Sequence, residues 1–148
     1  IENNATKYDF ITCNSFIQKD NFKKQSTTIP AYFFKNPKKY ILQSNYIMSP
    51  TVLIRKSALI NAGLFDEKLT SCQDWDMWVR IILKGYKITS IEKPLTIYKK
   101  DNSDSIGLSK NAKKGYRLFF RKHLTNILKY TSIKNWIKMI IIYFSKFR

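Results

Sequence analysis

The chain has 148 residues, of which 44% are hydrophobic and 15% aromatic, and its formal net charge is +17 at pH 7. This composition is typical of a domain with a hydrophobic core, and it excludes a disordered, collagen-like or low-complexity chain. Cys13 and Cys72 lie far apart and have no CxxC companion, which excludes a disulfide scaffold and fits a reducing compartment. No run approaches the ~20 consecutive apolar residues that a membrane-spanning helix needs.

The charges are unevenly distributed along the chain. All ten Asp and Glu lie at or before Asp104, whereas residues 105–148 contain eleven Lys and Arg and no carboxylate side chain. We therefore interpret the chain as a body of mixed charge, residues 1–110, followed by a basic tail, residues 111–148.

The first half of the chain predicts two strands separated by a loop-rich segment. Residues 8–17 are rich in β-branched and aromatic side chains, which favours a strand. Residues 18–44 are polar and aromatic and contain two prolines, a pattern typical of loop with short helical pieces. Residues 45–54 end in an apolar Val-Leu-Ile run, which predicts a second, buried strand.

A short helix over residues 55–62 comes next, and Gly63 stands where a left-handed C-terminal cap is expected. A longer helix then begins with Ser71 as its expected N-cap, and Asp74 three residues later completes the pattern of a capping box. This helix ends at Gly85. Its apolar residues repeat at helical spacing and predict a buried stripe: Trp75, Trp78, Val79 and Ile82.

The rest of the chain predicts two more strands and a helical tail. Residues 86–91 favour a strand, residues 94–99 a separate short edge strand, and residues 110–148 two helices with a break near residue 131. Strands that alternate with helices indicate an α/β fold, here with part of a sheet.

Asp74 is the candidate catalytic residue. In the first turn of a helix, its carboxylate faces free backbone N–H groups and the positive end of the helix dipole. This environment favours the ionised form that a general base must hold at neutral pH. The alternative is structural: Asp74 only closes the capping box, and Asp76 only pairs with Arg80 four residues later.

The run SPTVLIRKSALINAGLFDEKLTSCQDWDMWVRIILKGYKI, continued by KPLTIYKKDNSDSIGLS, resembles the acceptor-side half of a family 2 glycosyltransferase. In that family a strand and a short helix lead to a G-F-D-E-like turn, and an acidic pair then opens a helix that carries a Trp four residues later. The resemblance covers roughly residues 40–110. It implies a partial GT-A fold, a mixed α/β sheet with flanking helices, followed by basic amphipathic helices.

Carried over residue by residue, the resemblance implies that Asp74 accepts the proton of the acceptor hydroxyl in an inverting displacement. Gln73 stands where the family often has Glu, so an amide replaces one carboxylate contact to the acceptor. The residues implied to bind the acceptor are Gln73, Asp66, Glu67 and Trp78. The alternative for Asp66 and Glu67 is that they only stabilise the turn, and Trp78 is also expected to anchor the core.

The end of the last predicted strand is the implied donor side. Asp101 stands where many members carry a His near the metal, and an Asp there can ligate Mg²⁺ or Mn²⁺. Lys99, Lys100 and Ser105 are implied to approach the donor pyrophosphate. The alternative for all four residues is a solvated surface loop.

Two features of the family are missing from this sequence. Members bind the nucleotide with an N-terminal half that ends in a D-x-D metal motif. Here no D-x-D follows an apolar strand, and no glycine-rich phosphate loop occurs. We therefore expect the main ligands of the divalent cation to lie outside this chain. We expect a C-terminal part of an enzyme, whose natural start lies upstream and which is inactive without its donor-binding half.

The tail has the composition of a helix that lies on anionic lipid, because the segment KNWIKMIIIYFSKFR places aromatic residues among Lys and Arg. The alternative is a helix packed on the body with a solvated basic face. The resemblance implies a hexosyltransferase-like enzyme of bacterial cell-envelope polysaccharide synthesis. The tail adds the expectation that the enzyme is cytoplasmic and peripheral on the inner face of the membrane. Its partners would be a nucleotide-sugar donor, a glycan or lipid-linked acceptor, and an anionic membrane surface bound by residues 111–148.

The competing hypothesis is a basic membrane-peripheral or nucleic-acid-binding module without catalysis. The net charge of +17 fits nucleic acid. The sequence contains neither a recognition helix nor an aromatic RNA-binding motif, so it favours the membrane as the partner of the tail.

Overall fold

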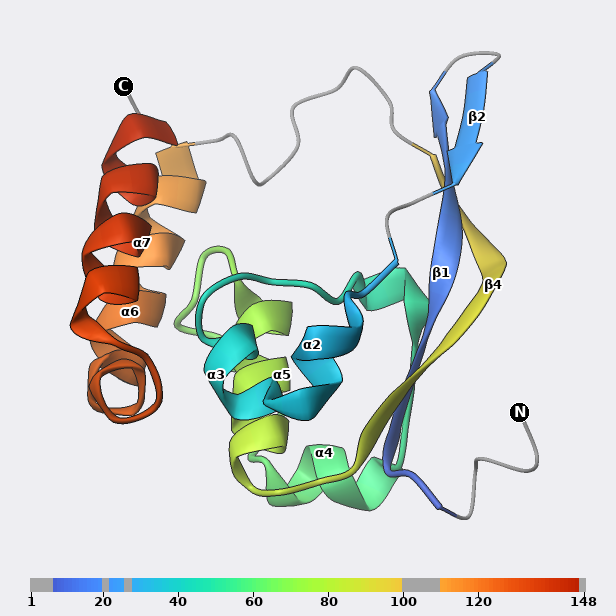
Figure 1. Ribbon diagram of the computed structural model, residues 1–148, viewed down its shortest axis with the longest axis horizontal. Coiled ribbons are helices and arrows are strands. Elements are labelled where there is room, and N and C mark those ends of the chain that lie inside the picture. Colours follow the sequence, from blue (N-terminus) through green and yellow to red (C-terminus); the bar gives the residue numbers. More distant parts are fainter. Residues whose placement is uncertain (1–6, 20–21, 26–27, 100–109, 147–148) are drawn as a thin grey trace.

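The computed structural model describes residues 7–19, 22–25, 28–99 and 110–146. A mixed sheet of four strands forms one side of the molecule (Figure 1). Its central strand is β1 (Phe10–Lys19), which pairs antiparallel with β2 (Phe22–Gln25) and β3 (Val52–Ile54) along one edge. Along its other edge, β1 pairs parallel with β4 (Ile88–Lys99).

The helices form two further layers beside the sheet (Figure 1). The layer next to the sheet contains α2 (Ala31–Lys35), α3 (Pro37–Ile41), α4 (Lys56–Asn61) and α5 (Gln73–Leu83). The outer layer is a hairpin of α6 (Lys110–Tyr130) and α7 (Ile133–Lys146). The mixed α/β fold, the helix ended by Gly63 and the break between the two tail helices are therefore confirmed.

Two strand predictions for the first half of the chain need correction. Residues 22–25 form β2 inside the segment that was expected to be loop and helix. Their sequence, FKKQ, has no alternating apolar pattern, and the strand forms because a hairpin pairs it with the end of β1. The strand predicted over residues 45–54 is limited to β3, because a 3-10 helix, η1 (Ser49–Thr51), precedes it. The strand β3 is also not fully buried: Leu53 is 55% exposed, because successive side chains of a strand point to opposite faces.

The predicted strands at residues 86–91 and 94–99 are one strand, β4. Pro94, at the start of the second predicted segment, cannot donate a backbone hydrogen bond to the sheet. In the structure Pro94 is the register partner of Asn14, and the pairing of β1 with β4 shifts register on both sides of Asn14. The irregularity therefore accommodates the proline within a continuous strand.

Helix α5 lies at the centre of the core. Seven of its eleven residues are buried, including the whole predicted stripe, so the helix is enclosed on more sides than one stripe requires. Towards the sheet, Trp78 packs edge-on against Phe10 at a ring-centroid distance of 5.0 Å. Towards the outer layer, Trp75 stacks on Phe119 at 4.0 Å, and its indole Nε1 donates to the carbonyl of Ile41 at 2.6 Å.

Helix α6 approaches the body closely at Gly115. A Cβ atom at this position would lie 2.7 Å from the backbone nitrogen of Ser71 and 2.8 Å from its carbonyl oxygen, so only glycine fits without a shift. Farther along α6, Phe119, His123 and Ile127 are buried. One face of α6 thus belongs to the core, while Leu124 and Leu128 on another face are 41% and 52% exposed.

Candidate active site

The start of α5 differs from the predicted capping box. The N-cap is Cys72, whose backbone is left-handed with φ 63°, and no side chain caps the helix. The hydroxyl of Ser71 instead donates to the carbonyl of Ala112 in α6, at 3.3 Å. The prediction is wrong because the tail helix, which lies far away in the sequence, offers this hydroxyl a buried acceptor.

Asp74 lies in the first turn of α5, and its carboxylate is held by three donors. The backbone N–H of Trp75 donates to Oδ1 at 2.6 Å. The hydroxyl of Ser49 donates to Oδ2 at 2.7 Å, and the amide of Asn45 donates to the same oxygen at 3.4 Å. These contacts fix the direction of a half-buried carboxylate, which is what a positioned base requires.

A pocket of about 490 Å³ opens beside this carboxylate. Its size is within the range of small-molecule sites, about 300–1,000 Å³. Its walls come from the loop before β3, the turn before α5, the first turn of α5, and α6. They are Asn45, Ser49, Phe65, Ser71, Cys72, Gln73, Asp74, Trp75 and Tyr116. The tail therefore supplies one wall of the pocket.

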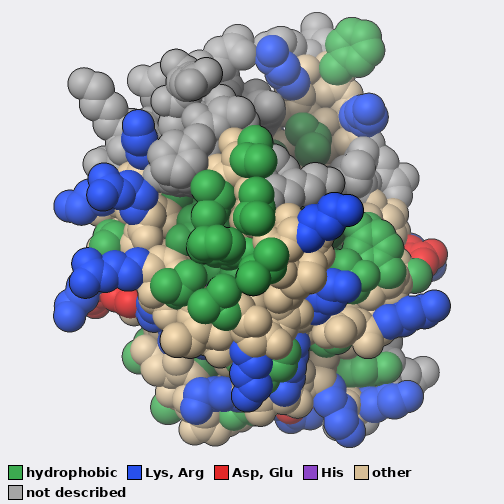
Figure 2. Space-filling model, turned by 60° about the vertical axis from the view of Figure 1, so that its left-hand side comes forward, with side chains coloured by type: hydrophobic (Ala, Val, Ile, Leu, Met, Phe, Trp, Pro, Cys, Tyr) green, Lys and Arg blue, Asp and Glu red, His purple; other side chains and the backbone are tan. Residues whose placement is uncertain are grey.

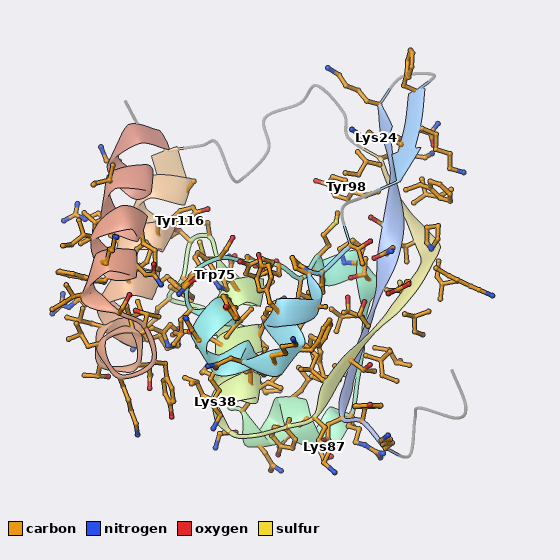
Figure 3. The ribbon with its side chains drawn as sticks, in the orientation of Figure 1. Lys24, Lys38, Trp75, Lys87, Tyr98 and Tyr116 are labelled. Atoms are coloured by element: carbon orange, nitrogen blue, oxygen red, sulfur yellow. The ribbon has the colours of Figure 1, made fainter. Side chains whose placement is uncertain are left out.

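Aromatic side chains form the apolar part of the pocket. Trp75 and Tyr116 lie next to each other where α5 faces α6, with ring centroids 6.0 Å apart (Figure 3). Phe65 is 51% exposed, although it is a large apolar side chain. An exposed aromatic ring beside a carboxylate is suited to the face of a sugar ring, which has apolar C–H groups and polar hydroxyls.

The other residues expected to bind the acceptor lie differently. Gln73 lines the pocket, but Asp66, Glu67 and Trp78 do not. Asp66 forms an ion pair with Lys122 of α6 at 2.5 Å, and Glu67 is exposed. Trp78 is 3% exposed and contacts Phe65 edge-on, with their ring centroids 6.4 Å apart.

On the expected donor side, Lys99 is exposed at the end of β4. Lys100, Asp101 and Ser105 lie outside the described residues. Within the described part of the chain, no group of three or more His, Cys, Asp or Glu side chains is placed to hold a metal ion.

Asp76 is the centre of a buried ion cluster. It is fully buried, and Arg80 bonds to Oδ2 through Nε at 2.9 Å, so the predicted pair of Asp76 with Arg80 is confirmed. Lys122 of α6 lies 3.0 Å from both carboxylate oxygens. The Nε2 atom of His123 lies 2.8 Å from Oδ1. An ionised carboxylate only accepts hydrogen bonds, so Nε2 is the donor in this contact.

The cluster sets the pKa of Asp76. Burial alone would raise it, but the hydrogen bonds from His123 and Lys122 and the charges of Arg80 and Lys122 outweigh burial and lower the pKa from 3.8 to about 2. The hydrogen bond from Lys122 also lowers the pKa of Asp66. Asp76 is therefore an anion that fixes α6 on α5.

Sequence reasoning missed four contributors to this region: Asn45, Ser49, Tyr116 and His123. Asn45 and Ser49 lie in the segment that was predicted to be a strand, and the resemblance gave them no role. The two tail residues contact α5 only through the fold. The one available signal was His123, which is the only histidine of the chain. A single histidine with no nearby partner in sequence does not identify the carboxylate that it contacts.

Known proteins give an independent assignment. Residues 2–140 match the family described as "Glycosyltransferase like family 2". A 74-residue part, half of the chain, is 36% identical to an uncharacterized glycosyltransferase of Methanocaldococcus jannaschii and spans a quarter of that protein's length. No solved structure matches the chain. The resemblance found in the sequence is thus confirmed, and the mixed sheet with flanking helices is consistent with a GT-A-like domain.

The low pKa of Asp76 predicts a specific dependence of stability on pH. The folded-state pKa of about 2 lies below the usual value of 3.8, so the stabilisation is present above pH 4 and is lost as the pH falls towards 2. At pH 7 we expect Asp76→Asn to lower the free energy of unfolding by about 2 kcal/mol or more. Urea unfolding at equilibrium should show this difference shrinking between pH 4 and pH 2.

The matched control is Asp9→Asn. Asp9 pairs with Arg55 at 3.3 Å on the surface, and such pairs contribute about 0–1 kcal/mol. A difference between the Asp76 variant and the unmodified chain that stays constant from pH 7 to pH 2 would contradict the assignment.

Proposed function

Because the chain belongs to the family Glycosyltransferase like family 2, we propose that it transfers a sugar from a nucleotide-sugar donor to a hydroxyl group of a glycan or lipid-linked acceptor. Asp74 is the general base of this proposal. The observation that carries it is the carboxylate of Asp74, held by Ser49, Asn45 and the N–H of Trp75 at the wall of a pocket.

The proposed reaction is one inverting displacement. The acceptor hydroxyl approaches Asp74, and its oxygen forms a bond with the anomeric carbon of the donor sugar while the bond from that carbon to the diphosphate breaks. The proton of the hydroxyl passes to Asp74, and the nucleoside diphosphate leaves with the electron pair of the broken bond. Ser49 and Asn45 keep the carboxylate directed at the hydroxyl through both hydrogen bonds to Oδ2.

The acceptor occupies the pocket in this proposal. Gln73 can donate and accept hydrogen bonds from the pocket wall, and the ring of Phe65 covers an apolar face of the sugar. The buried ring of Trp78 packs against Phe65 and holds it in place. Asp66 acts beside the pocket, where its ion pair with Lys122 ties the turn to α6, and Glu67 is the neighbouring exposed carboxylate for an extended acceptor.

Donor binding requires residues beyond the described site. The 148 residues contain no D-x-D after an apolar strand and no glycine-rich phosphate loop. The described residues offer no metal site. We therefore assign the nucleotide and any divalent cation to a part of the enzyme that these residues do not supply, and we expect the chain to be inactive without it. Lys99, Lys100 and Ser105 remain proposed contacts to the donor phosphates, and Asp101 remains a proposed oxygen ligand of the cation.

The hairpin of α6 and α7 is the proposed membrane-facing surface. No helix among the described residues is both long and apolar enough to cross a bilayer. Large apolar side chains nevertheless remain exposed on α7, where Ile133, Ile137 and Ile141 are 70%, 48% and 61% exposed. Their i, i+4 and i+8 spacing places them on one face, as in helices that lie in the membrane interface.

The role of Asp74 can be tested in a preparation that contains the donor-binding part. Asp74→Asn keeps the size of the side chain but cannot take the proton, so we expect kcat to fall by at least ~100-fold. Ser49→Ala removes one hydrogen bond that positions the carboxylate, so we expect a smaller loss of kcat, about tenfold.

Sugar transfer is measured with a radiolabelled donor. Glu92→Gln, an exposed change on β4, is the control and should leave kcat unchanged. Full turnover by the Asn variant would refute the assignment.

Membrane association is tested by sedimentation with vesicles that contain phosphatidylserine. Ile137→Asp places a charge in the apolar face of α7, so we expect it to weaken binding by about tenfold or more. The control is Ile60→Asp on α4, because Ile60 is 54% exposed on a helix outside the hairpin. Equal binding by both variants would exclude the hairpin as the membrane-facing surface.

A further inference from the structure

A second cavity lies between the two tail helices. This groove has a volume of about 730 Å³ and shares no lining residue with the pocket of Asp74. Six of its residues belong to α6 and two to α7. They are Lys114, Arg117, Leu118, Phe120, Arg121, Leu124, Trp136 and Ile140. The proposed glycosyl transfer uses none of them.

The groove carries a row of cations along one helix. Lys114, Arg117 and Arg121 are exposed, and their i, i+3 and i+7 spacing places them on the same side of α6. Among the residues that the structure describes, none of the three forms an ion pair. The sequence offers no local partner, because residues 105–148 contain no carboxylate side chain. The row is therefore complementary to an anionic group supplied by a ligand.

The rest of the groove is apolar. Its other lining residues are hydrophobic, with Trp136 and Ile140 half-buried and Leu124 41% exposed. Figure 2 shows the surrounding face, where hydrophobic side chains gather in the middle and Lys and Arg side chains lie around them. Leu128, four residues after Leu124, and Ile133, three residues before Trp136, are also exposed, at 52% and 70%.

From this juxtaposition we infer that the groove binds one molecule of a phosphate-headed lipid. The phosphate lies on Arg117 and Arg121, whose planar guanidinium groups match the oxygens of a phosphate. The hydrocarbon chain lies over Leu124, Trp136 and Ile140, where burial of its CH₂ groups contributes to binding. The exposed apolar side chains next to the groove let a chain enter sideways from a bilayer, which favours a lipid over an acidic peptide.

Lipid binding in the groove is independent of the proposed glycosyl transfer. A helix can lie on a bilayer without binding any single lipid, and Asp74 can act as a base whether or not the groove is filled. The test therefore uses monomeric lipid and no glycosyl transfer.

The probe is palmitoyl lysophosphatidic acid below its critical micelle concentration, and the readout is the fluorescence of Trp136. We expect a saturable change that Trp136→Phe abolishes. The double variant Arg117→Glu/Arg121→Glu should weaken binding by about tenfold or more, because both charge-assisted contacts are lost. Palmitoyl lysophosphatidylcholine, which has the same chain but no net charge, should also bind at least about tenfold more weakly.

The matched control is Lys129→Glu/Lys134→Glu, which makes the same change of net charge on exposed residues of α6 and α7 outside the groove. It should bind the probe almost as the unmodified chain does. If both double variants lost the same amount of affinity for the probe, net charge alone would explain the loss, and the inference would be overturned. A signal that begins only above the micelle concentration would overturn it as well, and would leave bilayer association as the role of this face.

Discussion

The buried carboxylate of Asp76 joins three separate parts of the chain. Arg80 binds it from the same helix and donates to the carbonyls of Ala62 and Leu64, in the turn that follows α4. Lys122 links it to Asp66, and His123 brings α6 against α5. A fully buried charge is costly unless donors surround it, so these contacts are needed together.

The site depends on this cluster although Asp76 does not face it. Residues two positions apart on a helix point in different directions, so Asp74 faces the pocket while Asp76 faces the tail. Because the cluster fixes α6, Tyr116 lies beside Trp75 and closes one wall of the pocket. The same docking leaves the other face of α6 to form the groove with α7. The ion cluster of Asp76 thus determines the position of α6, which forms one wall of the pocket of Asp74 and one side of the groove with α7.

The sequence pattern correctly predicted those features that depend on residues close together in the chain. The apolar repeat of α5, the left-handed Gly63 and the break between α6 and α7 depend on neighbours within a few residues, and the structure confirms them. The predicted capping box at Ser71 was wrong because a distant contact decides it: the hydroxyl of Ser71 donates to the carbonyl of Ala112, 41 residues away. The strand β2 was missed because pairing with β1 forms it, and no periodicity of its own marks it.

The candidate site was predictable only in part, for the same physical reason. The resemblance singled out Asp74 and Gln73, which both line the pocket, and membership of the family is confirmed. Ser49 stands at the start of the matched run and Tyr116 in the tail, and neither was given a role there, because only tertiary packing brings both to the pocket. The sequence separates an acid-containing body from an acid-free tail. It did not reveal that a buried acid of the body binds the tail.

The central claim is that Asp76 holds α6 on α5 through His123. A double-mutant cycle of Asp76→Asn and His123→Gln, measured by equilibrium unfolding in urea at pH 7, tests it most directly. We expect a coupling energy of about 1–3 kcal/mol, as for directly bonded buried groups. Single-variant effects that simply add, with a coupling energy near zero, would contradict the account.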